Sequence, residues 1–167
     1  MDQSTYDLAA KVGQSLIQRG WMLVTAESCT GGWVGQAVTA VSGSSAWYER
    51  GYITYSNTAK CEMLGVQQAT LDRYGAVSPQ TAQEMAIGAL NCSHAQISVS
   101  ITGIAGPDGG TAEKPVGMVC FAWAAQDGLV QQETHYFTGG RETIRRQAVV
   151  TALEGVLTML SHAAATA

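Results

Sequence analysis

Apolar residues recur along the chain with two different periods, which predict helices that alternate with strands. Near the N-terminus, Leu8, Val12 and Leu16 are four positions apart and predict an amphipathic helix over residues 5–19. The run WMLVTA, which follows Gly20, predicts a short buried strand. Further strands are predicted at residues 48–56, 97–101, 116–125 and 129–137.

Four further helices are predicted between and after these strands. One starts at the two glycines of TAESCTGG and continues to about residue 40. Another begins at Asn57, which we expect to be its N-cap. The third has the clearest start, with Ser78 as its N-cap and Pro79 at the first helical position. The last covers residues 141–161, where apolar side chains recur every four positions.

This order of elements predicts the fold class. Strands alternating with helices favour a three-layer α/β/α sandwich, with a mixed, mostly parallel sheet covered by helices on both faces. The turn QDG joins the last two strands as an antiparallel hairpin. The chain has 167 residues and no linker, repeat or low-complexity segment, so we expect a single domain over residues 1–167.

Composition and charge narrow the class of protein and of partner. Hydrophobic residues make up 46% of the chain and charged residues 13%, which indicates a globular protein with an apolar interior. The net charge is −4 and only nine Lys and Arg are present, so a small molecule is expected as partner rather than nucleic acid.

The cysteines and apolar runs bear on location. Four cysteines lie far apart without metal-ligand spacing, which favours reduced thiols in a cytoplasm over disulfides or a zinc site. No signal peptide precedes the first helix, and no apolar run approaches the roughly 20 residues of a membrane span. We therefore expect a cytoplasmic protein without a membrane partner.

Three polar segments follow predicted strands, and these hold the candidate chemistry. They are TAESCTGG (25–32), TYSNTAK (54–60) and ITGIAGPDGG (101–110). In open α/β sheets ligands bind beyond the carboxyl ends of the strands, so the three segments are expected to meet at one site.

The first segment combines nucleophiles with a predicted helix start. Free N–H groups of that helix at Gly31 and Gly32 would stabilise a phosphate, a carboxylate or a developing oxyanion. Ser28 or Thr30 explains the pattern equally well as a simple helix cap. Glu27 could orient an amine or bind a ribose, or it could merely complement the helix dipole.

The second segment supplies a candidate base for Ser28. No histidine is well placed for a Ser-His-Asp triad, but a desolvated lysine, or a tyrosine beside a lysine, can take a serine proton. Lys60 and Tyr55 are the candidates, against the ordinary alternatives of a solvated lysine and a tyrosine at the edge of the core. Cys29 is a rival nucleophile, and we favour a packing role for it.

The third segment and the start of the last helix complete the candidate site. The stretch that begins with Thr102 and Gly103 and ends at Gly110 is rich in glycine. Because glycine has no Cβ, its backbone N–H groups can approach a ligand closely. Arg141 could dock an anion, whereas Arg145 is interpreted as a solvated helix residue. We find no acidic cluster that would hold a metal.

Five blocks together resemble the CinA C-terminal family, over nearly the entire chain and in the family's order. The blocks are TAESCTGG, GSSAWYERGYITYSNTAKCEMLGV, YGAVSPQTAQEMAIGAL, SITGIAGPDGGTAEKPVG and FTGGRETIRRQA. That family includes stand-alone nicotinamide-nucleotide amidases, and we expect the stand-alone form.

The resemblance implies a function and a set of residues. It implies hydrolysis of the carboxamide of nicotinamide mononucleotide to nicotinic acid mononucleotide and ammonia, a salvage step without metal or cofactor, in a homo-oligomer. By matched position it implies Ser28 as nucleophile and Tyr55 and Lys60 as its activating partners. The expected substrate contacts are Glu27, Thr30, Gly31, Gly32, Ser44, Thr102, Gly103 and Arg141. Which of Ser28 and Ser44 attacks stays open, as do the alternatives of a non-catalytic nucleotide-binding module and an interaction module in DNA uptake or repair.

Overall fold

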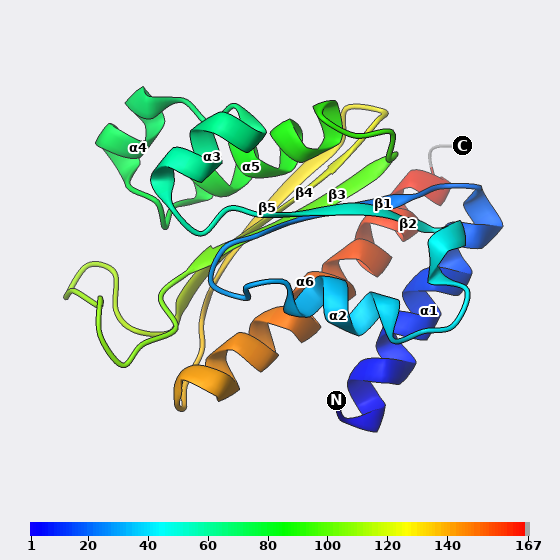
Figure 1. The fold of residues 1–167 in the computed structure, drawn as a ribbon, viewed down its shortest axis with the longest axis horizontal. Helices are drawn as coiled ribbons and strands as arrows, with labels where there is room; N and C mark the ends of the chain where they lie inside the picture. Colours follow the sequence, from blue (N-terminus) through cyan, green and yellow to red (C-terminus); the bar gives the residue numbers. More distant parts are fainter. Residues whose placement is uncertain (166–167) are drawn as a thin grey trace.

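The computed structural model, which describes residues 1–165, is a five-stranded sheet between two layers of helices (Figure 1). The strands are β1 (Leu23–Glu27), β2 (Tyr48–Ile53), β3 (Ile97–Gly103), β4 (Met118–Ala125) and β5 (Val130–Tyr136). The helices are α1 (Gln3–Arg19), α2 (Trp33–Thr39), α3 (Asn57–Leu64), α4 (Gln68–Tyr74), α5 (Pro79–Asn91) and α6 (Arg141–Ala165), with a 3₁₀ turn η1 (Ser44–Ala46). The last two residues of the predicted domain 1–167 lie outside the described residues.

The sheet has the order β2-β1-β3-β4-β5 and mixed pairing. The first three strands are parallel neighbours, and β4 is antiparallel to both β3 and β5. The predicted mixed sheet and its antiparallel hairpin are therefore confirmed, but the sheet is not mostly parallel, since it has two parallel and two antiparallel pairings. Glu27 at the end of β1 pairs with Ile53 of β2 and Ile101 of β3, so the segments after these strands emerge at one edge.

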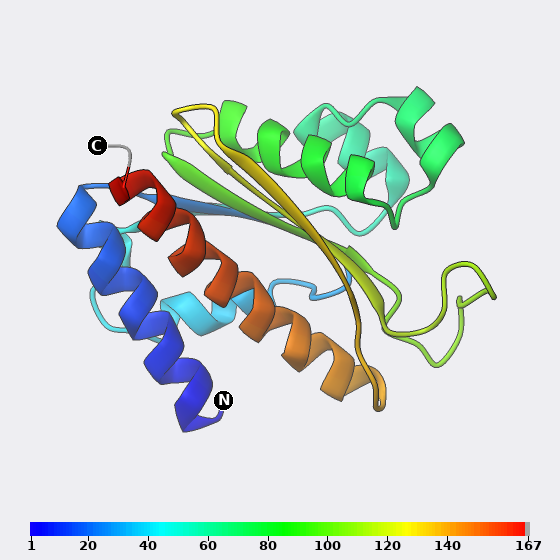
Figure 2. The ribbon, with the colours of Figure 1, turned by 180° about the vertical axis from the view of Figure 1, so that it is seen from behind.

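Helices cover both faces of the sheet, as predicted. In Figure 1, α3, α4 and α5 lie above the sheet and α1, α2 and α6 below it. Figure 2 shows α1 beside α6 on the lower face, where they pack together. The alternation of β3 fits both layers, since its apolar side chains face α6 and its serines face α5. Ser98 and Ser100 donate to the carbonyls of Ala86 and Ala82 in α5, at 2.7 and 2.5 Å.

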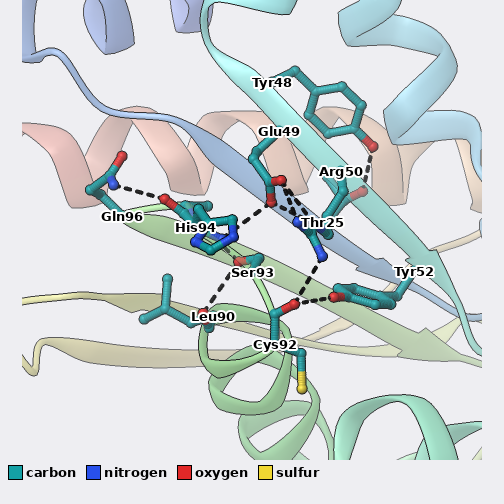
Figure 3. A network of polar contacts seen from close by, with 11 residues as sticks. Thr25, Tyr48, Glu49, Arg50, Tyr52, Leu90, Cys92, Ser93, His94 and Gln96 are labelled. Atoms are coloured by element: carbon teal, nitrogen blue, oxygen red, sulfur yellow. Dashed lines mark hydrogen bonds and ion pairs between the residues drawn. The ribbon is translucent and has the colours of Figure 1, made fainter.

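The edge strand β2 is held to the end of α5 by a polar network (Figure 3). Tyr52 Oη and Arg50 Nη1 both donate to the carbonyl of Cys92, at 2.5 and 3.2 Å. Arg50 also forms an ion pair with Glu49, whose carboxylate accepts from the N–H of His94. Because β2 leads directly into the second polar segment, this network helps to fix the site.

Two helix starts differ from the prediction for backbone reasons. Gly31 and Gly32 have φ of 60° and 101°, which is not helical, so α2 begins at Trp33 rather than at the glycines. α3 is capped by Ser56 rather than Asn57, because the Ser56 hydroxyl accepts from the N–H of Ala59.

The helix α4 and the turn η1 were not predicted. α4 is seven residues long, has no side-chain cap and buries only Leu71, so its sequence carries little helical pattern. The first and last helices are longer than predicted. α1 begins at Gln3 because Asp2 caps it, and α6 continues to Ala165.

Candidate active site

A cavity of about 210 Å³ lies at the edge of the sheet where β1, β2 and β3 end. Its walls come from all three polar segments and from the start of α6, so the expected convergence is observed. The lining residues are Ser28, Cys29, Tyr55, Asn57, Lys60, Ala76, Val77, Thr102, Gly103, Ala105 and Arg141.

A serine–lysine pair lies in this cavity. Ser28 follows β1, and its N–H donates to the carbonyl of Ile101 at 3.0 Å, which extends the sheet by one residue. Lys60 reaches it from α3, with Nζ 3.1 Å from Ser28 Oγ. The same Nζ donates to the carbonyl of Thr54 at 2.9 Å, so the ammonium or amine group is held from two sides.

The surroundings of Lys60 favour its neutral form. The side chain is 2% exposed, and burial lowers its pKa below the usual 10.5. Within residues 1–165, no carboxylate forms an ion pair with it. A buried amine without a counter-ion loses its proton readily, and the neutral amine is a base able to accept the proton of Ser28.

Cys29, next to Ser28, is buried in the core. Its thiol is 7% exposed, and burial raises its pKa to about 12. Because the thiolate is the reactive form, the thiol is unreactive at neutral pH. The interpretation of Cys29 as a packing residue is confirmed by its place in the core cluster beneath α2 and α6.

Arg141 and Tyr55 lie together at the mouth of the cavity. Arg141 is the first residue of α6, and its Nη2 donates to Tyr55 Oη at 3.1 Å. Its Nη1 donates to the carbonyl of Gly106 at 2.7 Å. Tyr55 is 64% exposed and forms no hydrogen bond with Ser28 or Lys60 in the described part of the chain. Tyr55 Oη therefore contacts Arg141 as an acceptor, and the expected contact of Tyr55 with the serine–lysine pair is not observed.

The start of α2 is occupied by the chain itself. The two carboxylate oxygens of Glu27 accept the N–H groups of Val34 and Gly35, at 2.9 and 3.0 Å. Glu27 is 2% exposed and does not line the cavity, so its observed role is to cap α2. Gly31 and Gly32 shape the turn before that cap, and the N–H of Gly31 donates to the Ser28 carbonyl at 3.0 Å.

Three more predicted residues take different places. Thr102 and Gly103 line the cavity, with the Thr102 hydroxyl donating to the Ala76 carbonyl at 2.7 Å. Thr30 is buried and lies outside the cavity lining.

Ser44 starts η1, which leads into the amino end of β2. Ser28 follows the opposite end of the neighbouring β1, a five-residue strand of about 16 Å at about 3.3 Å per residue. Of the two candidate serines, Ser28 is the one that lines the cavity.

One residue that the sequence analysis treated as solvated contacts this site. Arg145 donates to the backbone carbonyls of Cys29 and Thr30, both at 3.0 Å, and its guanidinium lies 5.2 Å from the centre of the Trp33 ring. The interpretation of Arg145 as a solvated helix residue is therefore wrong. Local sequence gave one signal only, the spacing of four that places Arg145 one turn after Arg141 on the same helix face.

Within residues 1–165, no three His, Cys, Asp or Glu side chains gather as a metal site would require. No helix in that part of the chain is long and apolar enough to cross a membrane.

Fold and site together define an α/β/α protein with a buried serine–lysine pair and an arginine at the carboxyl edge of its sheet. The chain belongs to the CinA C-terminal domain family, whose sequence model matches residues 5–160. It is 52% identical over 153 residues to a protein of Escherichia coli K12 named nicotinamide-nucleotide amidohydrolase PncC, with 92% of this chain and 93% of that protein covered.

A second relative and a solved structure are similar to this chain over nearly the same length. A protein of Enterobacter agglomerans with the same name is 49% identical over 156 residues, covering 93% of this chain and 95% of that protein. A crystal structure of the competence/damage inducible protein CihA from Agrobacterium tumefaciens superposes with a TM-score of 0.92 at 48% identity, covering 96% of this chain and 98% of that chain.

Proposed function

We propose that this protein hydrolyses the carboxamide of nicotinamide mononucleotide to nicotinic acid mononucleotide and ammonia, with Ser28 as nucleophile and Lys60 as base. One observation carries the proposal. The buried Nζ of Lys60 lies 3.1 Å from Ser28 Oγ in a cavity that also holds Arg141. The substrate is supported by relatives at 49–52% identity that are named nicotinamide-nucleotide amidohydrolases.

The first half-reaction acylates Ser28. The neutral amine of Lys60 accepts the hydroxyl proton while Oγ attacks the carboxamide carbon, and the carbonyl oxygen becomes an oxyanion. Lys60, now an ammonium group, then gives its proton to the amide nitrogen, the C–N bond breaks, and ammonia leaves. The Thr54 carbonyl keeps the Lys60 nitrogen in place through both proton transfers.

Backbone N–H groups of the loop after β3 are the proposed oxyanion donors. Ala105 lines the cavity, and the N–H groups of Ala105 and Gly106 donate to no atom of residues 1–165. The Arg141 side chain holds the Gly106 carbonyl, which fixes the orientation of this loop segment. Such preorganised donors stabilise a tetrahedral intermediate without reorganising during the reaction.

The second half-reaction releases the product acid. Water attacks the ester of Ser28 while Lys60 accepts a proton from it, and the returning proton restores the Ser28 hydroxyl as the nicotinate group leaves. Lys60 therefore accepts and returns the proton in both half-reactions. A metal or cofactor is not needed in this scheme, and its absence stays a prediction, as do the homo-oligomer and the cytoplasmic location.

Arg141 and Tyr55 are proposed to bind the ribose-phosphate end of the substrate. The guanidinium of Arg141 is the cationic group that lines the mouth of the cavity, where a 5′-phosphate would form charge-assisted hydrogen bonds. Tyr55 Oη already accepts from Arg141, so its own proton is free for the ribose-phosphate end of the substrate. We expect this end to favour the nucleotide over free nicotinamide.

The test is release of ammonia from nicotinamide mononucleotide by the purified protein, with the Ser28→Ala variant as blank and with chelator in parallel samples. We expect ammonia from the parent protein only, in amounts that chelator does not change. A protein that is stabilised by the nucleotide but releases no ammonia would instead be a binding module. Absence of both effects would favour an interaction module.

A further inference from the structure

Arg145 contacts the backbone of the turn that carries Ser28, although it lies 116 positions from Cys29 along the chain. Its Nε donates to the Cys29 carbonyl and its Nη2 to the Thr30 carbonyl, both at 3.0 Å. The planar guanidinium offers these donors in a fixed fork, which matches two successive carbonyls. Arg145 itself does not line the cavity.

Arg145 adds to a turn that has two backbone hydrogen bonds of its own, from the N–H of Gly31 to the Ser28 carbonyl and from the N–H of Trp33 to the Thr30 carbonyl, at 3.0 and 3.1 Å. Gly31 and Gly32 have positive φ and no Cβ, so their backbone is freer than that of other residues unless further contacts hold it. One end of the turn is anchored by the sheet through the N–H of Ser28, and the other by Glu27 through the start of α2. Arg145 holds the middle.

A continuous set of hydrogen bonds runs from Arg145 to Ser28. The guanidinium donates to the Thr30 carbonyl, and the same rigid peptide plane carries the N–H of Gly31 on its opposite side. That N–H donates to the Ser28 carbonyl at 3.0 Å. Fixing one carbonyl therefore fixes the peptide plane that bonds the nucleophile's own backbone.

From this geometry we infer that Arg145 is a positioning residue for Ser28: it acts through the backbone of the turn and keeps Oγ within reach of Lys60. The expected effect on kcat rests on the proposed function. The expected effect on the position of Ser28 does not depend on that function. Both the charge and the two-donor shape are required, since a lysine can bond one carbonyl but not both.

The kinetic test compares Arg145→Met and Arg145→Lys with the matched control Arg146→Met, whose side chain lies by a separate cavity near Asp2. We expect Arg145→Met to lower kcat at least about tenfold with KM nearly unchanged, because a displaced nucleophile affects the chemical step more than binding. The kcat of Arg145→Lys is expected to lie between those of Arg145→Met and the parent, and the kcat of Arg146→Met to match that of the parent. Guanidinium ion added to Arg145→Ala should restore part of kcat, a recovery that a general loss of packing would not give.

A second readout needs no nucleotide substrate. An alkyl fluorophosphonate labels an activated serine: Oγ bonds to phosphorus, fluoride leaves, and the proton passes to Lys60. We expect Ser28 in Arg145→Met to be labelled at least about tenfold more slowly than in the parent or Arg146→Met, as followed by mass spectrometry. Labelling at the parent rate would overturn the inference even if ammonia release is absent, and slow labelling would support it independently.

Folding is checked in the same samples by thermal unfolding. If Arg145→Met does not fold, Arg145→Lys takes its place, and labelling of that variant at the parent rate would overturn the inference. A parent protein that is labelled but releases no ammonia would contradict the proposed function and leave this comparison intact.

Discussion

The Nζ of Lys60 and the Oγ of Ser28 lie 3.1 Å apart, and each arrives from a different strand of the same parallel pair. Ser28 follows β1, and Lys60 lies on α3 after β2. Since parallel strands end at the same edge, two segments separated by 32 positions bring a serine hydroxyl and a lysine amine into one cavity. Burial lowers the pKa of Lys60, which is the direction that the proposed role as base requires.

Replacing each candidate serine separates the two roles that the sequence left open. We expect Ser28→Ala to lower ammonia release at least about 10³-fold, because no other side chain replaces the nucleophile. Ser44→Ala is expected to stay within about threefold of the parent, since Ser44 lies at the other end of the strands. Steady-state rates of ammonia release measure both. Loss of activity in Ser44→Ala with full activity in Ser28→Ala would reverse the assignment.

The lowered pKa of Lys60 predicts how activity depends on pH. The base must be neutral, so kcat/KM should rise as pH increases through this pKa, which lies below 10.5, and then level off. Lys60→Met should abolish turnover over the whole range. The dependence of kcat/KM on pH, measured for the parent, tests this rise. A kcat/KM that falls with rising pH in this range would argue against Lys60 as base.

The same group predicts how stability depends on pH. Between the lowered pKa and 10.5, the unfolded chain binds a proton at this lysine that the folded chain does not. The free energy of unfolding should therefore rise with pH across that window, and the penalty for burying Lys60 is complete below it. Denaturant unfolding at several pH values measures the slope. Lys60→Met should lack this contribution, and an identical slope in both proteins would contradict the expectation.

Arg141 is predicted to discriminate in favour of the nucleotide. Arg141→Met should raise KM for nicotinamide mononucleotide by about 10- to 100-fold with a smaller change in kcat, since a charge-assisted contact to phosphate is lost. The rate with free nicotinamide should fall less, and only as far as the lost bond from Arg141 to the Gly106 carbonyl loosens the oxyanion loop. Comparing kcat/KM for the two substrates provides the measurement, and an equal loss for both would exclude a phosphate contact.

Cys29 should be dispensable for the chemistry. Its thiol is buried with a pKa of about 12, so iodoacetamide at neutral pH should leave activity intact while modifying the exposed Cys92. Cys29→Ala should retain activity within about fivefold, the loss coming from packing near Ser28. Mass spectrometry of the alkylated protein, read beside residual activity, checks both statements. Inactivation that tracks modification of Cys29 would return it to the list of nucleophiles.

Close packing of α6 against the sheet gives a prediction for stability. A Cβ on Gly155 would come within 2.1 Å of the Trp123 ring, whose Nε1 donates to the Ala152 carbonyl at 3.0 Å. Gly155→Ala should therefore destabilise the protein by about 1–3 kcal/mol through overpacking. Gly140→Ala is the matched control, because no atom lies within 4 Å of its added Cβ. Chemical denaturation measures both, and equal midpoints would contradict the packing argument.

Local pattern was sufficient for the elements that carry strong periodicity. α5 was predicted from Ser78 and Pro79, and both residues take the cap and first-turn positions expected of them. The strand in WMLVTA was predicted because its apolar run is short, and the strand at residues 97–101 because apolar residues alternate with serine there. α4 was missed since it has no cap side chain and its one buried residue, Leu71, defines no period.

Contacts between distant segments are where sequence reasoning failed. Nothing near Arg145 indicates that its partners are the carbonyls of Cys29 and Thr30, because backbone acceptors have no sequence signature. Glu27 was expected at the substrate, yet its carboxylate bonds the N–H groups that open α2. Both errors have one physical origin: the orphan groups of a turn can be satisfied by the chain or by a ligand, and the pattern of residues is the same in either case.

The dependence of the site on α6 bears on how the protein is made. Ser28 follows β1, the first strand to leave the ribosome. Arg141 and Arg145 belong to α6, the last helix. A nascent chain therefore carries Ser28 for most of its synthesis without the two arginines that contact the mouth of the cavity and the Ser28 turn. Under the proposed function, we expect Ser28 to become reactive only once the last helix has been synthesised and has packed onto the sheet.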